Sequence, residues 1–240
     1  MEETPIILWF RRDLRLADLP VLAEAIASGR PLVPVFIRDE VVEALGAAPM
    51  WRMGLAVKHF AGVLGGVGSR LTLRRGPAVG VLRALVAETG AGAVWWTRTY
   101  DPAGKARDMG VKTALKAAGT EARSFPGQVL FEPMDVQTGE GGYYKVYSPF
   151  WRAVKDRAVP RPAAAPKALR APDLWPRSEE LDDWRMGAAM RRGADVVDRH
   201  AQVGEAAALA RLDRFLAGAI DGYKERRDFP SEPATSGLSE

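Results

Sequence analysis

The chain has 240 residues, of which 47% are hydrophobic, so it is long enough for one large domain or for one domain and part of another. It contains no cysteine and two histidines, which excludes disulfides, iron–sulfur clusters and a catalytic cysteine and argues against a zinc or haem centre. No run reaches the ~18 uninterrupted apolar residues of a membrane span, and the amino terminus lacks the pattern of a signal peptide. We therefore expect a monomeric, soluble, cytoplasmic protein that uses neither a metal nor a membrane.

The net charge of +4 is distributed unevenly along the chain. Residues 1–130 carry 17 Lys and Arg against 12 Asp and Glu, whereas residues 131–240 carry 17 against 18. A mild basic excess in the first half is compatible with a phosphate-bearing partner but does not require one.

The first predicted strand, residues 5–10, is a short apolar run of the kind that is buried on both faces of a parallel sheet. It is followed at once by the charged turn RRDLR at residues 11–15. Ligands of open α/β sheets bind outside the carboxyl ends of the strands, so this turn is a candidate site. The alternative is structural: the arginines pair with Asp13 and Asp18 and link two elements of the fold.

Strands and helices then alternate as far as residue 125. Further strands are predicted at residues 31–37, 70–74, 92–97 and 121–125, and helices at residues 20–28, 49–64, 77–89 and 104–118. Pro34 would suit an edge strand or a bulge, because it cannot donate a ladder hydrogen bond. The last helix is expected to face inward through Ala106, Met109, Val111 and Leu115.

This alternation has the spacing of βαβ crossovers. It predicts a Rossmann-like, doubly wound, five-stranded parallel sheet with right-handed crossovers and helices on both faces.

The pattern changes after residue 127. Residues 135–144 are glycine-rich and polar, and residues 143–157 form an aromatic segment that leads into a short helix. Residues 160–176 are rich in Pro and Ala, which predicts an extended, semi-rigid interdomain linker. Residues 178–200 have few large apolar side chains and are expected on the surface.

One long amphipathic helix of about five turns is predicted over residues 205–223. Its apolar side chains recur at steps of three and four residues and require a partner helix: Leu209, Leu212, Phe215, Leu216, Ala219, Ile220 and Tyr223. Seventeen residues follow Tyr223, too few to supply that partner, so we expect the domain that begins here to be incomplete.

Three strings, in order and with similar spacing, resemble the photolyase/cryptochrome family: WFRRDLRLAD, YYKVYSPFW and VGEAAALARLDRF…YKERRDFPSEPATSGLS. The resemblance covers the whole chain. It implies an α/β antenna domain over residues 1–130, an interdomain linker over 131–200, and the truncated start of an all-α FAD-binding domain over 201–240.

The resemblance also implies a partial FAD site at the end of the chain. Its residues are Tyr223 and a loop that lies at the diphosphate in the family: Thr235, Ser236, Gly237, Leu238 and Ser239. Small hydroxyl side chains and exposed backbone N–H groups can form an anion cradle. The alternative is a frayed polar tail.

Some members of the family bind a folate as antenna chromophore, and others bind a deazaflavin. Ala103 and Gly104 stand where folate-binding members have an Asn-Glu pair, so a folate antenna is not expected. A deazaflavin antenna implies residues around the end of the second strand and the next helix, although Thr99 replaces the expected acidic group and Arg38 and Arg52 could equally be surface residues. The implied antenna residues are Arg12, Phe36, Ile37, Arg38, Arg52 and Asp101.

The implied function is that of a deoxyribodipyrimidine photolyase, a carbon–carbon lyase. Its complete form repairs cyclobutane pyrimidine dimers in UV-damaged DNA by light-driven electron transfer from reduced FAD. We expect this chain alone to be inactive, to lack stoichiometric FAD and to bind DNA weakly. The alternatives are a stand-alone Rossmann-like module that binds a nucleotide or chromophore, and a fragment of a cryptochrome-type photoreceptor.

Overall fold

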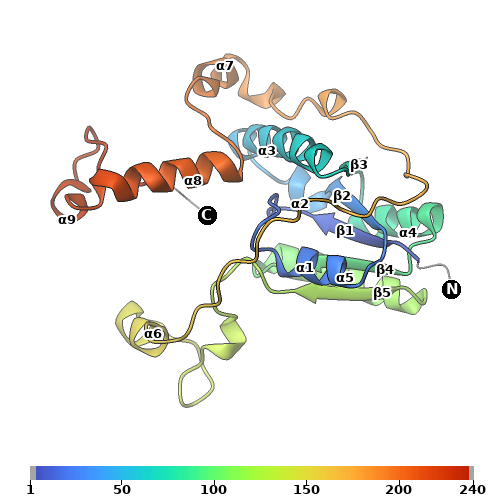
Figure 1. Cartoon of the computed structure of the whole chain (residues 1–240), viewed down its shortest axis with the longest axis horizontal. Helices are drawn as coiled ribbons and strands as arrows, with labels where there is room; N and C mark the ends of the chain where they lie inside the picture. Colours follow the sequence, from blue (N-terminus) through green and yellow to red (C-terminus); the bar gives the residue numbers. More distant parts are fainter. Residues whose placement is uncertain (1–3, 238–240) are drawn as a thin grey trace.

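A computed structural model describes residues 4–237 of the chain (Figure 1). An α/β domain forms one body, from which α6 and the helices after α7 project (Figure 1). The elements are β1 (Ile6–Phe10), α1 (Pro20–Ala27), β2 (Leu32–Arg38), α2 (Glu40–Glu43), α3 (Ala47–Gly66), β3 (Thr72–Arg75), α4 (Ala78–Thr89), β4 (Ala93–Thr97), α5 (Pro102–Ala117), β5 (Glu121–Phe125), η1 (Pro133–Asp135), α6 (Tyr147–Val154), η2 (Asp182–Trp184), η3 (Ala188–Met190), α7 (Arg192–Asp198), α8 (Glu205–Arg214), η4 (Phe215–Ala219) and α9 (Tyr223–Arg226).

The five strands form one parallel sheet in the order β3-β2-β1-β4-β5, which confirms the predicted fold class. β1 is the central strand, and Ile6 pairs with Leu32 of β2 on one side and with Ala93 of β4 on the other. The chain builds outward from β1 to β3 and then returns to add β4 on the opposite side. The strand order therefore reverses between β1 and β4, which is where open α/β sheets bind their ligands.

Alternation along β1 divides the core into two layers. Ile6, Leu8 and Phe10 point to the face covered by α1 and α3, whereas Ile7 and Trp9 point to the face covered by α4 and α5. Successive strand residues point to opposite faces, so a strand that is apolar throughout needs a helical layer on each side. All five residues of β1 are buried, as the sequence predicted.

Pro34 lies in an internal strand rather than in an edge strand, because β2 is flanked by β1 and β3. β2 as a whole is therefore not an edge strand, but Pro34 itself lies where the sheet ends locally, as expected of a proline near an edge. Pairing with β3 begins only at Val35, whereas Pro34 itself is opposite Leu8 of β1. At this position β2 has one neighbour, and the missing N–H of proline removes no bond to β3.

The inward face of α5 differs from the prediction at two positions. Val111 and Leu115 are buried as expected, but Met109 is 66% exposed and Ala106 is exposed. The polar residues Arg107 and Asp108 are directed inward in their place and form ion pairs with the ends of the strands. Apolar periodicity could not reveal this, because the inward stripe of α5 is charged in its first half.

The stretch after residue 160 wraps around the α/β domain. The backbone N–H of Leu32 donates to the carbonyl of Arg170, and the N–H of Glu179 donates to the carbonyl of Leu73 on the edge strand β3. Trp184 and Met186 are buried in the α1–α3 layer of the core, with exposures of 3% and 6%. The expectation that residues 178–200 lie only on the surface was therefore wrong at these two positions.

The predicted helix over residues 205–223 is interrupted. α8 ends at Arg214, a π-helical turn follows over η4, and α9 begins at Tyr223. Gly218 and Gly222 lie in and just after the irregular part, and glycine is a weak helix former. The apolar stripe is largely exposed: Leu209 is 55% and Leu216 51% exposed. Over residues 4–237, no helix is long and apolar enough to cross a membrane.

Candidate functional site at the carboxyl ends of the strands

Charged side chains converge where β1 and β4 end. Arg11 and Asp13 are only 3% and 2% exposed. The Arg11 backbone N–H donates to Asp13 Oδ1 at 2.8 Å, the Thr97 hydroxyl donates to Asp13 Oδ2, and the Arg11 guanidinium donates to the Thr97 carbonyl. These bonds connect the charged turn after β1 to the last residue of β4.

The same cluster extends to α5 and to the end of β2. Arg11 Nη1 lies 3.0 Å from Asp108 Oδ1, and Arg107 Nη2 lies 2.9 Å from the same oxygen. Arg107 Nη1 is 2.9 Å from Asp39 Oδ2, while the other Asp39 oxygen caps α2. We call Arg11, Asp13, Asp39, Arg107 and Asp108 the buried charge cluster.

In the buried charge cluster, arginines and carboxylates pair with one another away from water. Burial lowers the pKa of Arg11, and the neighbouring Asp108 and Asp13 oppose that shift. The guanidinium carbons of Arg11 and Arg107 lie 4.4 and 4.7 Å from the centre of the Trp9 ring. Every charged member has an opposite charge or a hydrogen-bond partner, so the arrangement favours the structural interpretation of the turn.

The arginines of this turn do link elements of the fold, as expected, but the partners of their guanidinium groups are not the carboxylates of Asp13 and Asp18. Arg15 donates to backbone carbonyls of Asp18 and Gly127 rather than to a carboxylate. Arg107, Asp39 and Asp108 were missed by the sequence reasoning. Asp39 follows directly after β2, and its position at the carboxyl end of a parallel strand was the one available signal.

Three of the six predicted antenna residues contact the segment that follows residue 183. Phe36 is fully buried, and its ring centre lies 6.1 Å from that of Trp184. Arg38 donates to the Trp184 carbonyl at 2.6 Å and pairs with Glu43 at 2.8 Å. Arg52 donates to the Gln202 carbonyl at 2.6 Å.

The other three predicted antenna residues are placed differently. Ile37 is fully buried in the α4–α5 layer, and Arg12 is exposed next to the buried Arg11. Asp101 caps α5, where its Oδ1 accepts from the Gly104 N–H at 2.7 Å. We call Phe36, Arg38 and Arg52, which all contact the segment after residue 183, the candidate antenna strip; the other three residues do not belong to it.

The predicted FAD residues lie at the distal end of the projecting helices. Tyr223 is 39% exposed and packs edge-on against Phe215, with ring centres 5.9 Å apart. Arg211 of α8 donates to the Ser236 carbonyl, so the loop of Thr235, Ser236 and Gly237 folds back on α8. Leu238 and Ser239 lie outside the described residues.

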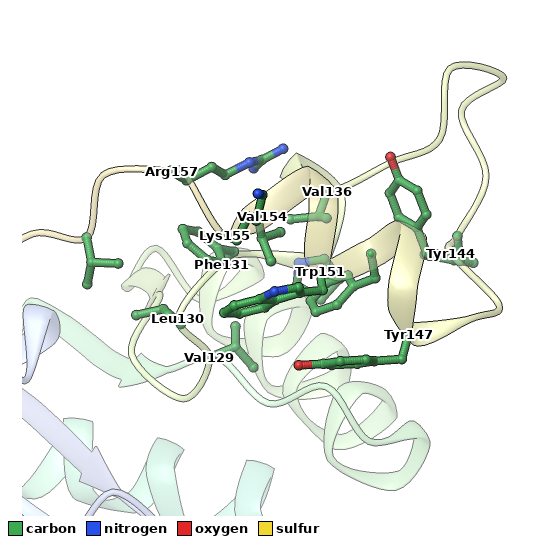
Figure 2. Close-up of a pocket in the computed structure, with 14 residues that line it drawn as sticks. Val129, Leu130, Phe131, Val136, Tyr144, Tyr147, Trp151, Val154, Lys155 and Arg157 are labelled. Carbon is green, nitrogen blue, oxygen red and sulfur yellow. The ribbon is translucent and has the colours of Figure 1, made fainter.

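The aromatic segment of the sequence encloses a large cavity, shown in Figure 2. This aromatic pocket has a volume of about 590 Å³ and is lined by residues between Val129 and Val159. Tyr147 and Trp151 of α6 are stacked with an interplanar angle of 12°, and they are 69% and 49% exposed. The pocket is predominantly apolar, with Lys155 and Arg157 at its edge (Figure 2).

Two smaller cavities lie on the α/β domain. One of about 360 Å³ is enclosed by α3 and residues 181–188. The other, of about 500 Å³, lies between α5, the ends of β4 and β5, and residues 133–143; we call it the α5 cavity. Among residues 4–237, no group of three or more His, Asp and Glu side chains is arranged to hold a metal ion.

These features define a doubly wound α/β protein in which one of the cavities, the α5 cavity, lies at the carboxyl ends of β4 and β5. A family model described as DNA photolyase matches residues 6–168. The chain therefore belongs to the DNA photolyase family.

Individual relatives agree with this assignment. The deoxyribodipyrimidine photo-lyase of Agrobacterium fabrum is 44% identical over all 240 residues, which correspond to 50% of that protein. The crystal structure of a bacterial class III photolyase from Agrobacterium tumefaciens superposes with a TM-score of 0.94 over 100% of this chain and 50% of that one. The chain thus spans about half the length of these relatives.

A shorter relative is also similar. An uncharacterized 31.6 kDa protein from the atpI 5′ region of Synechococcus sp. PCC 6716 is 32% identical and aligns with 97% of this chain. The alignment covers 82% of that protein, so its length is close to that of the present chain.

Proposed function

We propose that this chain is the amino-terminal, antenna-bearing half of a DNA photolyase, and that its complete form repairs cyclobutane pyrimidine dimers in UV-damaged DNA. The observation that supports this most directly is the superposition of the entire chain on half of a class III photolyase at 44% identity. On this proposal, residues 1–130 are the antenna domain, 131–200 the linker, and 201–240 the start of the FAD-binding domain.

The residues for FAD in this chain are Tyr223 and the loop at residues 235–239. FAD, when bound in the complete protein, supplies the electron for light-driven dimer splitting. The described part of the set forms one open edge: Tyr223 is 39% exposed, and the backbone of Ser236 is bonded to Arg211. Such an edge can contact a dinucleotide but does not enclose it, so residues 1–240 alone are proposed to hold little FAD and to lack repair activity.

Absorption spectroscopy of the purified chain tests this part of the proposal. We expect less than about one tenth of an equivalent of FAD, because small-molecule sites bury most of the ligand surface. A yellow protein with a resolved flavin spectrum near one equivalent would overturn it. Illumination of a dimer-containing oligonucleotide with the reduced chain should leave the dimer intact.

For the antenna, we propose a deazaflavin-type chromophore held by the strip of Phe36, Arg38 and Arg52, with Arg12, Ile37 and Asp101 as the remaining candidates. Folate binding through the Asn-Glu contact is not supported, because Gly104 occupies the acidic position. A Cβ atom at Gly104 would lie 2.6 Å from both Asp101 Oδ2 and Thr99 Oγ1, so this backbone has no room for a side chain there.

Titration with a deazaflavin and with a reduced folate tests the choice of chromophore. Fluorescence of the deazaflavin should change on binding to the wild-type chain and less on binding to R38A/R52A. Folate binding at comparable affinity would contradict the proposal.

DNA binding by the isolated chain is proposed to be weak and salt-sensitive. The basic excess of residues 1–130 supplies non-specific attraction to phosphates, which weakens steeply with salt. A gel-shift titration between low and physiological salt measures this. Tight, dimer-specific binding at physiological salt would argue for a complete damage pocket within these 240 residues.

A second candidate function is a stand-alone chromophore-binding module. The Synechococcus protein favours it, because this chain aligns with 82% of a protein of 31.6 kDa. Co-expression with the carboxyl-terminal half of a class III photolyase distinguishes the two: a photolyase half should assemble with it and acquire FAD, and a stand-alone module should not.

A further inference from the structure

The aromatic pocket is an apolar surface that the described residues leave open. Of the side chains that line it, Leu130, Tyr143, Tyr147 and Val159 are between 54% and 77% exposed, and Trp151 is 49% exposed. Contiguous apolar patches on soluble proteins commonly mark surfaces that a partner covers. The pocket is therefore a candidate docking site.

Contacts within its own segment hold the aromatic pocket in shape. Val136 and Val154 are only 6% and 4% exposed. Arg157 donates to the Asp135 carbonyl at 2.9 Å, and its guanidinium carbon lies 5.6 Å from the centre of the Phe131 ring. A surface that is already ordered loses less conformational entropy when a partner binds.

Glu132 attaches this segment to the α/β domain. Arg98, directly after β4, pairs with Glu132 at 2.5 Å, and the Tyr100 hydroxyl donates to the other carboxylate oxygen. Burial, together with the bond to Glu132, raises the pKa of Tyr100 to about 12, so the hydroxyl keeps its proton at neutral pH. The pocket is thus presented at a defined place beside the α/β domain.

The charges at the aromatic pocket indicate the chemistry of its partner. The lining includes Lys155 and Arg157 but no acidic residue. Lys155 lies 3.8 Å from Asp156, whose side chain is 84% exposed, and Arg157 donates to two backbone carbonyls. A complementary partner therefore presents an apolar side chain to the pocket and carboxylates to its edge.

A second apolar surface lies on the same side of the α/β domain. α6 and α8 both project from that side, on the left in Figure 1, and the α8 stripe is exposed at Leu209 and Leu216. The chain corresponds to 50% of the Agrobacterium fabrum photolyase and to 50% of the class III photolyase structure. The other half of such a protein follows α8 in sequence, which brings it to the side of the α/β domain where α6 lies.

We propose that the aromatic pocket is a docking site for the carboxyl-terminal half of a photolyase. An apolar side chain of that half lies against Trp151 and Leu130, and carboxylates next to it pair with Lys155 and Arg157. Residues 129–159 are then a second contact between the two halves, separate from α8, rather than a passive linker. The inference rests on the proposed function, because the partner is taken from the photolyases.

Co-expression of the tagged 240-residue chain with the carboxyl-terminal half of the class III photolyase from Agrobacterium tumefaciens tests the docking site. The amount of that half that copurifies is measured, and hydrogen exchange of residues 143–157 is compared between the complex and the chain alone. We expect Y147A/W151A to reduce copurification about tenfold or more, because aromatic anchors carry much of the binding energy of an interface. In the wild-type complex, the amides of α6 should exchange about tenfold more slowly than in the chain alone.

A control double variant removes two exposed apolar side chains elsewhere. Ile26 and Leu174 are 39% and 83% exposed and line none of the three cavities, so I26A/L174A should leave copurification unchanged. Equal losses in the two double variants, or unprotected residues 143–157 in the complex, would overturn the proposal. So would a wild-type chain that associates with a second copy through Tyr147 and Trp151 in preference to the carboxyl-terminal half.

The FAD content and repair activity of the complex separate this inference from the proposed function. A complex that protects residues 143–157 but holds no FAD and repairs no pyrimidine dimers supports the docking site and contradicts the proposed function. A complex that holds FAD and repairs DNA, but forms equally well with Y147A/W151A, contradicts the docking site alone. Absence of any complex with the wild-type chain contradicts both.

Discussion

The α/β domain and the projecting segments of this molecule differ in how far their side chains are buried. In the α/β domain even the members of the buried charge cluster are enclosed and paired: Arg11 is 3% exposed and bonded to Asp108. In the segments around α6 and α8, aromatic and aliphatic side chains are exposed, among them Trp151 at 49% and Leu209 at 55%. A sequence rich in apolar residues therefore does not by itself show where a closed core forms.

This difference shows that a closed hydrophobic core requires a second layer of helices or strands, and that apolar side chains alone do not form one. β1 is covered on both faces because two pairs of helices return to the sheet. α8 and η4 carry an apolar stripe but have no second layer among the described residues. Large exposed apolar patches on soluble proteins commonly mark surfaces that another element or partner covers. This contrast leads to four predictions, ordered by expected effect.

The largest effect is expected from R11M. It removes the guanidinium that links β1, the Thr97 carbonyl and Asp108, and it leaves buried carboxylates with fewer partners. Breaking a buried pair by removing one member costs about 3–5 kcal/mol. Urea unfolding followed by circular dichroism measures the loss.

The neighbouring arginine supplies the control for that experiment. Arg12 is exposed, so R12M should change the free energy of unfolding by less than about 0.5 kcal/mol. Similar losses in R11M and R12M would show that burial of the charge is not what stabilises the turn.

W184A tests whether the segment that wraps around the α/β domain belongs to its core. We expect W184A to lower the free energy of unfolding by at most about 3–5 kcal/mol. Trp184 is 3% exposed, packs near Phe36 and donates its indole N–H to Glu179 at 2.9 Å. L174A is the control, because Leu174 is 83% exposed on the same segment. Thermal unfolding that is unaffected by W184A would mean that residues 178–190 are dispensable for the domain.

An intermediate and pH-dependent effect is expected for E179Q. Burial raises the pKa of Glu179, but hydrogen bonds from Trp184 and from the backbone and guanidinium of Arg75 outweigh this and lower it. A lowered pKa contributes stability above the unfolded value, and that contribution is lost as the pH falls through the folded value. At pH 7 the free energy of unfolding of the wild type should therefore exceed that of E179Q by about 1 kcal/mol.

The pH dependence itself is the check on that prediction. Denaturant unfolding is measured from pH 7 to pH 3. The difference in free energy of unfolding between wild type and E179Q should become smaller below about pH 4.3, where glutamate in the unfolded chain is protonated. A difference that stays constant over this range would show that the carboxylate charge contributes nothing.

The smallest stability effect is expected for W151A in the aromatic pocket. Trp151 is 49% exposed and stacks on Tyr147, so its removal should cost less than about 1 kcal/mol. It should nevertheless lower the fluorescence of a bound apolar dye, because Trp151 lines the pocket of about 590 Å³. A large loss of stability would mean that this pocket is part of the folded core.

Much of the fold follows from local sequence pattern. The five strands lie within two residues of their predicted ends, and β5 matches at both ends, because apolar runs bounded by Gly and Pro reveal buried strands. The inward face of α5 was predicted wrongly and the internal place of β2 in the sheet was not predicted, since both depend on partners far away in the sequence. For the candidate antenna strip, the sequence resemblance indicated Phe36, Arg38 and Arg52, but it did not indicate that Trp184 and Gln202 would contact them.

The sequence by itself determined the parallel α/β architecture, the burial of the strand at residues 5–10 on both faces and the membership in the photolyase family suggested by its three strings. Only the tertiary structure decided what the charged turn after that strand does. Asp39, Arg107 and Asp108 reach Arg11 or one another across as many as 97 positions of the chain. Such a cluster has no local period, because the residues meet only where strands that are not consecutive end at the same edge of the sheet.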